Sequence, residues 1–588
     1  MKEKIFKITG FTFPGNISER QYDGVYVKYD GTDAVIGYQT KAQKARCFFL
    51  LSTKVKNGEN CFELSEKPVF DTCGPMLDLA CVGVPIKVKY IKEYIDHVAA
   101  LGMNMLMLYT EDMYELESYP MFGYLRGRYS MEELKEVDDY AYEMGVELIP
   151  CIQTLGHFSA YLRWSEAAAI KENATTILPG EEKTYEFIEA QIRTMRSCMR
   201  SNRIHLGMDE AVNLGLGTYL KKHGMEDAFD IFNKHLDRVI AIAKKYEYKP
   251  MIWSDMYFGA EDPLEYYNPD AVIPQHAVES APAGVDMVFW DYYHEDYEYY
   301  DKKFIQHARF QNDTCFAGGI WNWDGPVPNF KYSLSSMIPA LKCCVDRNIR
   351  TVIAAIWDYG DCDFTMSYEG LAIFSEYCYK GAACTKEDIY AAAEGISGNK
   401  AEFIDAVSDF YLGYQGSVGL GKGFFYTDPL LPLLCYDIAY EDVIKVYRNS
   451  RNVIEKYQDN PFYDFYRLIF DIVMLKADIV LNLKAEYDKG NKAYLENAYQ
   501  NTLPALQKLY KEFYVVFMTN WHEKYKPFGV ERTTTLFGGM DLRLEYAAKK
   551  LEAYCTGKLD TVEELDEAVV KGINKTWRRP IEYAWNRV

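Results

Sequence analysis

The chain has 588 residues, which is too long for one ordinary hydrophobic core and predicts roughly three to four domains. Hydrophobic residues make up 49% and charged residues 26% of the chain, a composition typical of a folded globular protein. The formal net charge of −21 disfavours binding to nucleic acid or to an anionic membrane surface, so we expect neither as a partner.

Neither the amino terminus nor the cysteines indicate an exported or membrane protein. Residues 1–7 contain no apolar stretch of signal-peptide length, and no later segment is apolar for long enough to span a bilayer. The 14 Cys are scattered without paired Cys-x-x-Cys modules, which favours reduced thiols over a disulfide framework or a zinc site. We therefore expect a cytoplasmic protein.

The pattern of the chain divides it into three parts. Residues 1–72 contain short alternating segments, 24–29 and 46–51, and predict a small strand-rich α/β domain. From residue 73 to 376, short apolar runs alternate with amphipathic stretches. The apolar runs predict eight strands, at 74–78, 104–110, 146–152, 203–208, 250–255, 286–293, 314–321 and 350–357.

Eight strands that alternate with helices over about 300 residues have the period of a (β/α)8 barrel. A doubly wound open sheet is the alternative, but no Gly-rich dinucleotide-binding turn follows the first strand. We therefore predict an α/β fold: a (β/α)8 TIM barrel with a small N-terminal α/β domain and a C-terminal α-helical domain.

Residues 377–588 read as amphipathic helices, because apolar residues recur every three or four positions on a polar background. The predicted helices are 386–393, 400–411, 440–457, 463–488, 492–519 and 561–570; the residues around Met540 fit no predicted element. Such a bundle can cover the barrel or hold a partner subunit, and we expect a homodimer.

The fourth apolar run, Arg203–Met208, ends in two adjacent carboxylates, Asp209 and Glu210. In a parallel barrel the carboxyl ends of the strands build the active site. A regular strand would direct only one of two neighbouring side chains inward, but the backbone can turn at the strand end and let both reach one ligand.

Carboxylates and indoles gather at the other predicted strand ends, and five of the nine Trp follow four consecutive strands. The C–H faces of a sugar stack on indole, while Asp and Glu accept hydrogen bonds from its hydroxyls. This combination predicts a sugar site. Its candidate residues are Asp78, Glu111, His157, Asp209, Glu210, Trp253, Asp255, Trp290, Asp291, Tyr293, Trp321, Trp323, Trp357, Asp358 and Asp361.

The run His205–Glu210 resembles the His-x-Gly-x-Asp-Glu motif of glycoside hydrolase family 20, the β-N-acetylhexosaminidases. The resemblance extends over residues 1–375. Further segments that fit the family follow other predicted strands: Leu108–Asp112, Gly156-His157, Trp253-Ser254-Asp255 and Trp357.

The resemblance implies a retaining exo-hydrolase of terminal GlcNAc or GalNAc on small oligosaccharides, with no metal or organic cofactor. Glu210 would be the general acid and later the base, and Asp209 would orient the substrate's acetamido group, whose oxygen is the nucleophile. His157 would hydrogen-bond into the relay of the acid. Trp253, Trp321 and Trp357 would line the acetamido and ring faces.

Three positions depart from the family pattern. Cys73 stands where the family has a sugar-binding Arg near the first strand, so Asp78 or Glu111 would take part in hydroxyl recognition. The usual Tyr-x-Asp reads Phe289-Trp290-Asp291, which leaves Tyr293 as the expected donor to the acetamide oxygen. The usual Trp-x-Glu becomes Trp357-Asp358-Tyr359, so Asp358 or Asp361 would replace that carboxylate.

Two other functions are weighed against a hydrolase of this kind. The missing Arg suggests a non-catalytic carbohydrate-binding protein on the same barrel, since a fold does not fix a function. A metal-dependent barrel hydrolase would need His-x-His or a carboxylate cluster with ligand spacing, and the 9 His never occur as His-x-His.

Overall fold

The computed structural model describes residues 1–259, 263–412, 419–431 and 440–568. These residues form two compact units. The first contains residues 1–321, 332–358 and 367–398, and the second contains residues 322–331, 359–366 and the chain from 399 onward. None of the helices in the described ranges combines the length and the apolar character needed to cross a bilayer.

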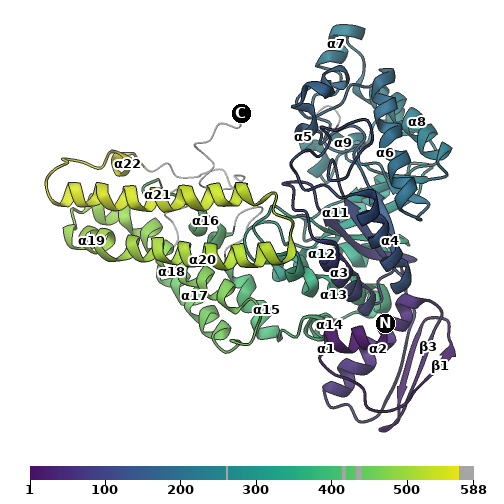
Figure 1. Ribbon diagram of the computed structural model, residues 1–588, viewed down its shortest axis with the longest axis horizontal. Helices are drawn as coiled ribbons and strands as arrows, with labels where there is room; N and C mark the ends of the chain where they lie inside the picture. The colour runs from purple at the N-terminus through teal and green to yellow at the C-terminus, as the bar shows by residue number, and fades with distance from the viewer. Residues whose placement is uncertain (260–262, 413–418, 432–439, 569–588) are drawn as a thin grey trace. The chain divides into compact units, whose positions relative to one another are not determined.

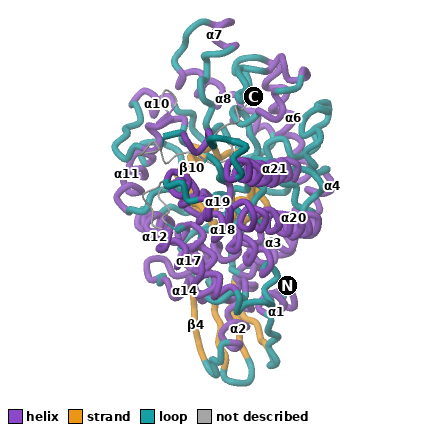
Figure 2. The backbone as a smooth tube through the Cα atoms, turned by 90° about the vertical axis from the view of Figure 1, so that its left-hand side faces the viewer, coloured by secondary structure: helices purple, strands orange, loops and turns teal. Residues whose placement is uncertain are grey.

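The first unit begins with a four-stranded sheet of order β1-β3-β2-β4, in which β1 and β3 are parallel and the other pairs antiparallel. Figure 2 shows its strands as a group separate from those of the barrel. Helix α2 packs against this sheet and against α3. The elements are α1 (Lys2–Thr9), β1 (Ile17–Gln21), β2 (Val25–Tyr29), β3 (Ala34–Tyr38), α2 (Lys41–Lys56) and β4 (Phe62–Glu66).

Eight parallel strands then close into a barrel, as predicted, because β12 pairs with β5 from Thr351↔Thr72 to Ile356↔Leu77. Most residues of these strands are buried, as expected for a parallel sheet covered on both faces. The strands are β5 (Thr72–Asp78), β6 (Met105–Tyr109), β7 (Glu147–Cys151), β8 (Arg203–His205), β9 (Lys249–Trp253), β10 (Asp286–Trp290), β11 (Thr314–Gly319) and β12 (Thr351–Ile356).

The helices between the strands follow the predicted periodicity closely, and several carry the expected caps. Ser130 and Glu133 form a capping box at the start of α4, and Gly145 ends that helix in the left-handed conformation. The α-helices of this part are α3 (Val88–Ala100), α4 (Met131–Met144), α5 (Ser159–Leu162), α6 (Glu182–Cys198), α7 (Thr218–His223), α8 (Ala228–Lys245), α9 (Met256–Gly259), α10 (Gln275–Ser280), α11 (Tyr297–His307), α12 (Phe330–Asp346), α13 (Tyr368–Lys380) and α14 (Lys386–Ser397).

The second unit is helical, which confirms the predicted fold class. Its long helices α18, α20 and α21 lie side by side (Figure 1). The loops 322–331 and 359–366 belong to this unit, where Tyr426 Oη donates to Asp361 Oδ2 at 2.9 Å. The α-helices are α15 (Ala401–Ser408), α16 (Leu420–Tyr426), α17 (Tyr440–Ile454), α18 (Tyr463–Asp488), α19 (Lys492–Asn497), α20 (Leu503–Lys524), α21 (Val530–Cys555) and α22 (Glu563–Asp566). The predicted domain boundaries after residues 72 and 376 stay predictions.

Four sequence-based assignments were wrong in part. Residues 46–51 lie inside α2 rather than in a strand, because this helix is buried on several faces and shows no polar stripe. The strand predicted at 203–208 ends at His205. The helix predicted at 492–519 is interrupted by a π-helical turn at 498–502, just before Pro504. Only 563–566 of the helix predicted at 561–570 is helical, and its last two residues lie outside the described ranges.

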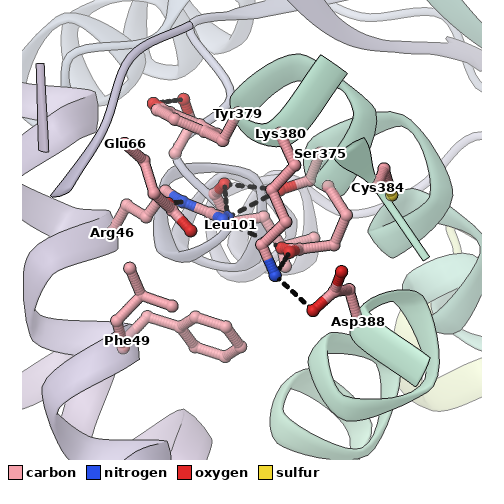
Figure 3. Close-up of polar contacts among 12 residues, drawn as sticks. Arg46, Phe49, Glu66, Leu101, Ser375, Tyr379, Lys380, Cys384 and Asp388 are labelled. Carbon is pink, nitrogen blue, oxygen red and sulfur yellow. Dashed lines mark hydrogen bonds and ion pairs between the residues drawn. The ribbon is translucent and has the colours of Figure 1, made fainter. Parts of the chain in front are cut away.

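A buried ion cluster joins the N-terminal sheet to the barrel's outer helices within the first unit (Figure 3). The completely buried guanidinium of Arg46 donates to Glu66 at 2.6 Å, to Glu376 at 2.9 Å and to the Leu101 carbonyl at 3.1 Å. Lys380 Nζ lies 2.9 Å from Glu376 Oε2. These carboxylates hold the pKa of Arg46 above its usual value despite burial, which by itself lowers that pKa.

Candidate active site

The chain that follows β8 leaves the extended conformation before it reaches the two carboxylates. Gly207, Met208 and Glu210 have φ values of 71°, 74° and 46°. At Gly207 a Cβ atom would collide with the side chain of Gln153, so only glycine fits there. Strained non-glycine backbone of this kind is stabilised by surrounding structure and clusters at functional sites.

This turn brings Asp209 and Glu210 to the same imidazole. His157 Nε2 lies 3.0 Å from Asp209 Oδ2 and 3.7 Å from Glu210 Oε2. The side chain of Asp209 is only 10% exposed, whereas that of Glu210 is 54% exposed. One carboxylate is therefore held inside the site, and its neighbour faces the open side.

A second set of contacts fixes the other oxygen of Asp209. Gln153 Nε2 donates to Asp209 Oδ1 at 2.8 Å and to Tyr109 Oη at 3.0 Å, while Gln153 Oε1 accepts the Met208 N–H at 3.1 Å. Tyr109 Oη donates to Glu111 Oε1 at 3.0 Å. The ends of β6, β7 and β8 are thus joined by one hydrogen-bond network around Asp209.

Asp255, after β9, supports Glu210 from the opposite side. Its Oδ2 accepts the backbone N–H of Glu210 at 2.9 Å, and its Oδ1 accepts the Trp290 Nε1–H at 3.3 Å. Asp255 is almost completely buried. Its contact fixes the main chain of Glu210 and does not involve the exposed carboxyl group of that residue.

Aromatic rings line the strand ends from β6 to β12 within the first unit. Trp357 meets the ring of Tyr109 edge to face at 4.9 Å and that of Tyr292 at 6.4 Å. Tyr292 stacks on Trp290 at 5.4 Å, and Tyr293 meets Trp321 edge to face at 5.5 Å. Trp253 is buried against the ring of His205, at 4.2 Å between ring centres, and packs inside the barrel.

Three carboxyl groups, those of Asp209, Glu111 and Glu210, surround the single imidazole of His157. Burial lowers the pKa of His157, but the carboxylates of Asp209, Glu111 and Glu210 outweigh it and raise that pKa to about 10. Burial raises the pKa of Asp209, but the His157 imidazolium and the Gln153 amide hold it below its usual value. His157 and Asp209 are therefore an ion pair at neutral pH.

Two further buried carboxyl groups, those of Glu111 and Asp255, keep their protons to higher pH than usual. Burial raises the pKa of Glu111 to about 7, against the attraction of His157 and Arg126. Burial and the negative charge of Asp209 raise the pKa of Asp255 to about 8. Buried acids with such pKa values, next to an ion pair, are typical of active sites.

Two of the predicted sugar-binding carboxylates are enclosed by their own backbone. Asp78 is completely buried; its Oδ1 accepts the Ala80 and Cys81 N–H groups, and its Oδ2 accepts that of Asp358 at 3.1 Å. Asp291 is equally buried and accepts hydrogen bonds from Tyr293 N, His294 N and Tyr300 Oη. In this structure both carboxylates brace strand ends rather than face a ligand.

The remaining predicted positions fall in different surroundings. Asp358 is buried next to Asp78, whereas Trp323 and Asp361 belong to the second unit. Cys73 does not face the barrel mouth, because its Sγ lies 3.8 Å from the Phe374 carbonyl of α13. Arg126, on the loop after β6, ion-pairs with Asp112 at 3.0 Å.

Four residues that shape the site are not among its predicted members: Tyr109, Gln153, Tyr267 and Tyr292. Tyr109 is the last residue of β6, and Gln153 and Tyr292 lie two residues beyond the ends of β7 and β10, so the sequence places these three at strand ends without marking them as site residues. Tyr292 was passed over for Tyr293, although Tyr292 is the one that contacts Trp357. Across the described ranges, no group of three or more His, Cys, Asp or Glu side chains is arranged to hold a metal ion.

Comparison with known proteins identifies two family regions in chain order. Residues 70–296 match the catalytic domain of glycosyl hydrolase family 20, and residues 416–577 match the C-terminal domain of glycoside hydrolase 20C. Two relatives are named hexosaminidase D: one from Homo sapiens, 27% identical over 37% of this chain and 44% of its own length, and one from Bos taurus, 26% identical over 37% and 62%. The matched region thus spans about half the length of these relatives.

Solved structures agree in fold. A family 20 exo-β-N-acetylglucosaminidase from Vibrio harveyi, in complex with N-acetylglucosamine, matches with a TM-score of 0.52 and 15% identity over 69% of this chain and 72% of that one. Another β-N-acetylhexosaminidase structure matches with a TM-score of 0.51 and 14% identity over 65% and 92%. With both family regions in order and the eight-stranded barrel closed, the chain belongs to glycoside hydrolase family 20.

Proposed function

We propose that the protein is a retaining exo-β-N-acetylhexosaminidase that removes a terminal, non-reducing GlcNAc or GalNAc by substrate-assisted catalysis. The observation that carries this proposal is the pair Asp209–Glu210 around His157, with one carboxylate enclosed and ionised and its neighbour exposed. The names of the relatives, hexosaminidase D, support the same reaction class.

In the first step Glu210 donates its proton to the glycosidic oxygen as the C1–O bond breaks, and the acetamido oxygen of the substrate attacks C1. Asp209 accepts the acetamido N–H and stabilises the positive charge that develops on that group. Because both Asp209 oxygens are already positioned by Gln153 and His157, the carboxylate needs little reorganisation.

In the second step the Glu210 carboxylate removes a proton from water, which attacks C1 and opens the oxazolinium ring with net retention. The nucleophile thus belongs to the substrate, and a second carboxylate on the opposite face of the sugar is not needed. Trp357 and Tyr292 would contact the acetamido group, and Glu111 the ring hydroxyls. The predicted cytoplasmic location and homodimer stay predictions.

The experiment is hydrolysis of p-nitrophenyl β-GlcNAc and β-GalNAc, with and without a thiazoline mimic of the oxazolinium. We expect turnover that the thiazoline blocks. Glu210→Gln should lower kcat about 100- to 10,000-fold on an alkyl glycoside, the range of general acid catalysis, and less on the activated aryl glycoside. Glu117→Gln, an exposed carboxylate after β6, is the matched control.

Near-full activity of Glu210→Gln on the alkyl glycoside would exclude the assigned acid. Binding of the sugar by the wild-type protein with no release from either substrate would instead favour a carbohydrate-binding protein on this barrel. Activity that withstands a chelator would fit the proposal, and loss of activity to a chelator would contradict it.

A further inference from the structure

A cavity of about 470 Å³ opens beside Glu210, on the side away from the hydrogen bonds that hold Asp209. Its walls come from the loop after β8, the start of α8, the loop after β9 and the end of β10. Glu210 and Asp255 form one end of it, and Tyr266, Tyr267 and Trp290 form an aromatic wall. Its volume is within the range of small-molecule sites, which is about 300 to 1,000 Å³.

The mouth of this cavity is apolar although it is open to solvent. Val212, Leu216 and Met225 line the cavity and are 46%, 52% and 76% exposed. Single exposed apolar side chains are common, but several around one concave site indicate a surface that is covered by a ligand. All three are aliphatic rather than aromatic, so they suit hydrocarbon better than the face of a sugar ring.

Apart from Glu210 itself, the acidic residues of the lining make contacts within the protein. Glu226 pairs with Lys234 and accepts the Tyr219 hydroxyl at 2.6 Å, and Asp227 caps α8 by accepting the Phe229 N–H at 2.9 Å. None of the described residues that line the cavity is a Lys, Arg or His. An anionic group would therefore meet carboxylates there and no cation.

The aromatic wall is held in place before any ligand arrives. The Tyr266 hydroxyl donates to the Trp290 carbonyl, and the completely buried Lys303 donates to the Tyr266 and Asn268 carbonyls at 2.7 and 2.8 Å. Because the 266–268 segment is fixed from both sides, binding needs little reordering of this wall.

We propose that this cavity, the Glu210 cavity, binds the leaving group of the substrate and selects an uncharged, apolar aglycone. The inference rests on the proposed function. The oxygen that Glu210 protonates must lie within hydrogen-bond reach of its carboxyl group. The group attached to that oxygen then continues into the space that Glu210 itself lines. The aliphatic side chains at the mouth favour an apolar aglycone, and the lack of cations among the described lining residues disfavours an anionic one.

The test compares kcat/KM for methyl, octyl and 7-carboxyheptyl glycosides of whichever β-N-acetylhexosamine the aryl assay prefers. The three alkoxide leaving groups are chemically alike, so differences report binding of the aglycone. We expect the octyl glycoside to exceed the methyl glycoside at least tenfold, and the 7-carboxyheptyl glycoside to lose most of that gain. The double variant Leu216→Ser/Met225→Ser should bring the octyl-to-methyl ratio close to one.

Ile305→Ser, which changes an aliphatic residue on α11 that is 45% exposed, is the control and should keep the wild-type ratio. Equal kcat/KM for methyl and octyl glycosides, or an unchanged ratio in the double variant, would overturn the inference while leaving the hydrolase intact. A neutral disaccharide cleaved better than the octyl glycoside would assign the cavity to a sugar instead. If no glycoside releases its sugar, the proposed function fails and this inference fails with it.

Discussion

Two clusters of buried charge lie in the first unit, and they are built in opposite ways. The Arg46 cluster consists of Arg46, Lys380, Glu66, Glu376 and Asp388, and its cations and carboxylates are nearly equal in number (Figure 3). The barrel-mouth cluster has four carboxyl groups and one imidazole: Glu111, Asp209, Glu210, Asp255 and His157.

The two clusters differ in the protonation of their buried groups. In the Arg46 cluster the guanidinium is charged and its donors are used by carboxylates and a carbonyl, so the charges are paired. In the barrel-mouth cluster the pKa of Glu111 is raised to about 7, because burial outweighs the attraction of His157 and Arg126. The pKa of Asp255 is raised to about 8 by burial and by the negative charge of Asp209. Buried charge alone is therefore weak evidence for an active site, whereas buried acids with raised pKa values at strand ends favour one.

Breaking the balanced cluster should affect stability and not chemistry. We expect Arg46→Met to lower the free energy of unfolding by about 3 to 5 kcal/mol, because Glu66 and Glu376 lose their buried partner. Calorimetric unfolding measures this loss, and kcat per folded molecule should stay at the wild-type value. The double variant Arg46→Met/Glu376→Gln should recover part of the stability. If Arg46→Met is as stable as the wild type, the prediction is wrong, and the ion pairs of Arg46 gain no more free energy than the burial of their charges costs.

Breaking the unbalanced cluster should do the reverse. We expect His157→Gln to lower kcat/KM about 10- to 100-fold, or about 1.4 to 2.7 kcal/mol of transition-state stabilisation, with a smaller change in stability. Without the imidazolium, burial raises the pKa of Asp209, so the acidic limb of the pH–rate profile should move to higher pH. His276→Gln, on the exposed face of α10, is the control. If the acidic limb of the pH–rate profile does not move, His157 does not control the ionisation of Asp209.

The barrel could be predicted from the sequence because its strands are buried on both faces and read as apolar runs between amphipathic stretches. The same rule was wrong for residues 46–51, since α2 is buried on several faces and its apolar residues no longer show a helical stripe. It also missed α21, where Gly538 and Gly539 interrupt a stripe formed by Leu536, Met540 and Leu544.

The candidate site was predictable only up to the strand ends. Asp78, Asp209 and Asp291 all follow buried runs and look alike in the sequence. The structure separates them by the next residues, since Asp78 and Asp291 accept the N–H groups two and three positions later, as Asp often does in turns. At Asp209 the chain instead turns through positive φ at Met208 and Glu210, which no local residue pattern announces.

The smallest effect is expected from the removal of Asp255, one of the acids of the barrel-mouth cluster. This change tests the difference between the two clusters most directly. Asp255 has a raised pKa in the folded state, so its contribution to stability is fully present below the unfolded pKa of 3.8 and is lost as pH rises through about 8. Asp255→Asn removes this titration. Between pH 6 and 7 we therefore expect the wild type to lose about 1.3 kcal/mol more stability than the variant, since one pKa unit corresponds to about 1.4 kcal/mol.

Thermal unfolding measured across that pH range gives the difference, with Glu117→Gln as the control for loss of an exposed carboxylate. Parallel curves for the wild type and Asp255→Asn would mean that Asp255 is ionised at neutral pH and that a cation offsets it. The barrel-mouth cluster would then be balanced like the Arg46 cluster. A steeper loss of stability with pH in the wild type would instead show that Asp255 is protonated at neutral pH and lacks a cation to offset its charge. This buried acid would then be kept at a cost in stability, because it holds the backbone of Glu210, the proposed general acid.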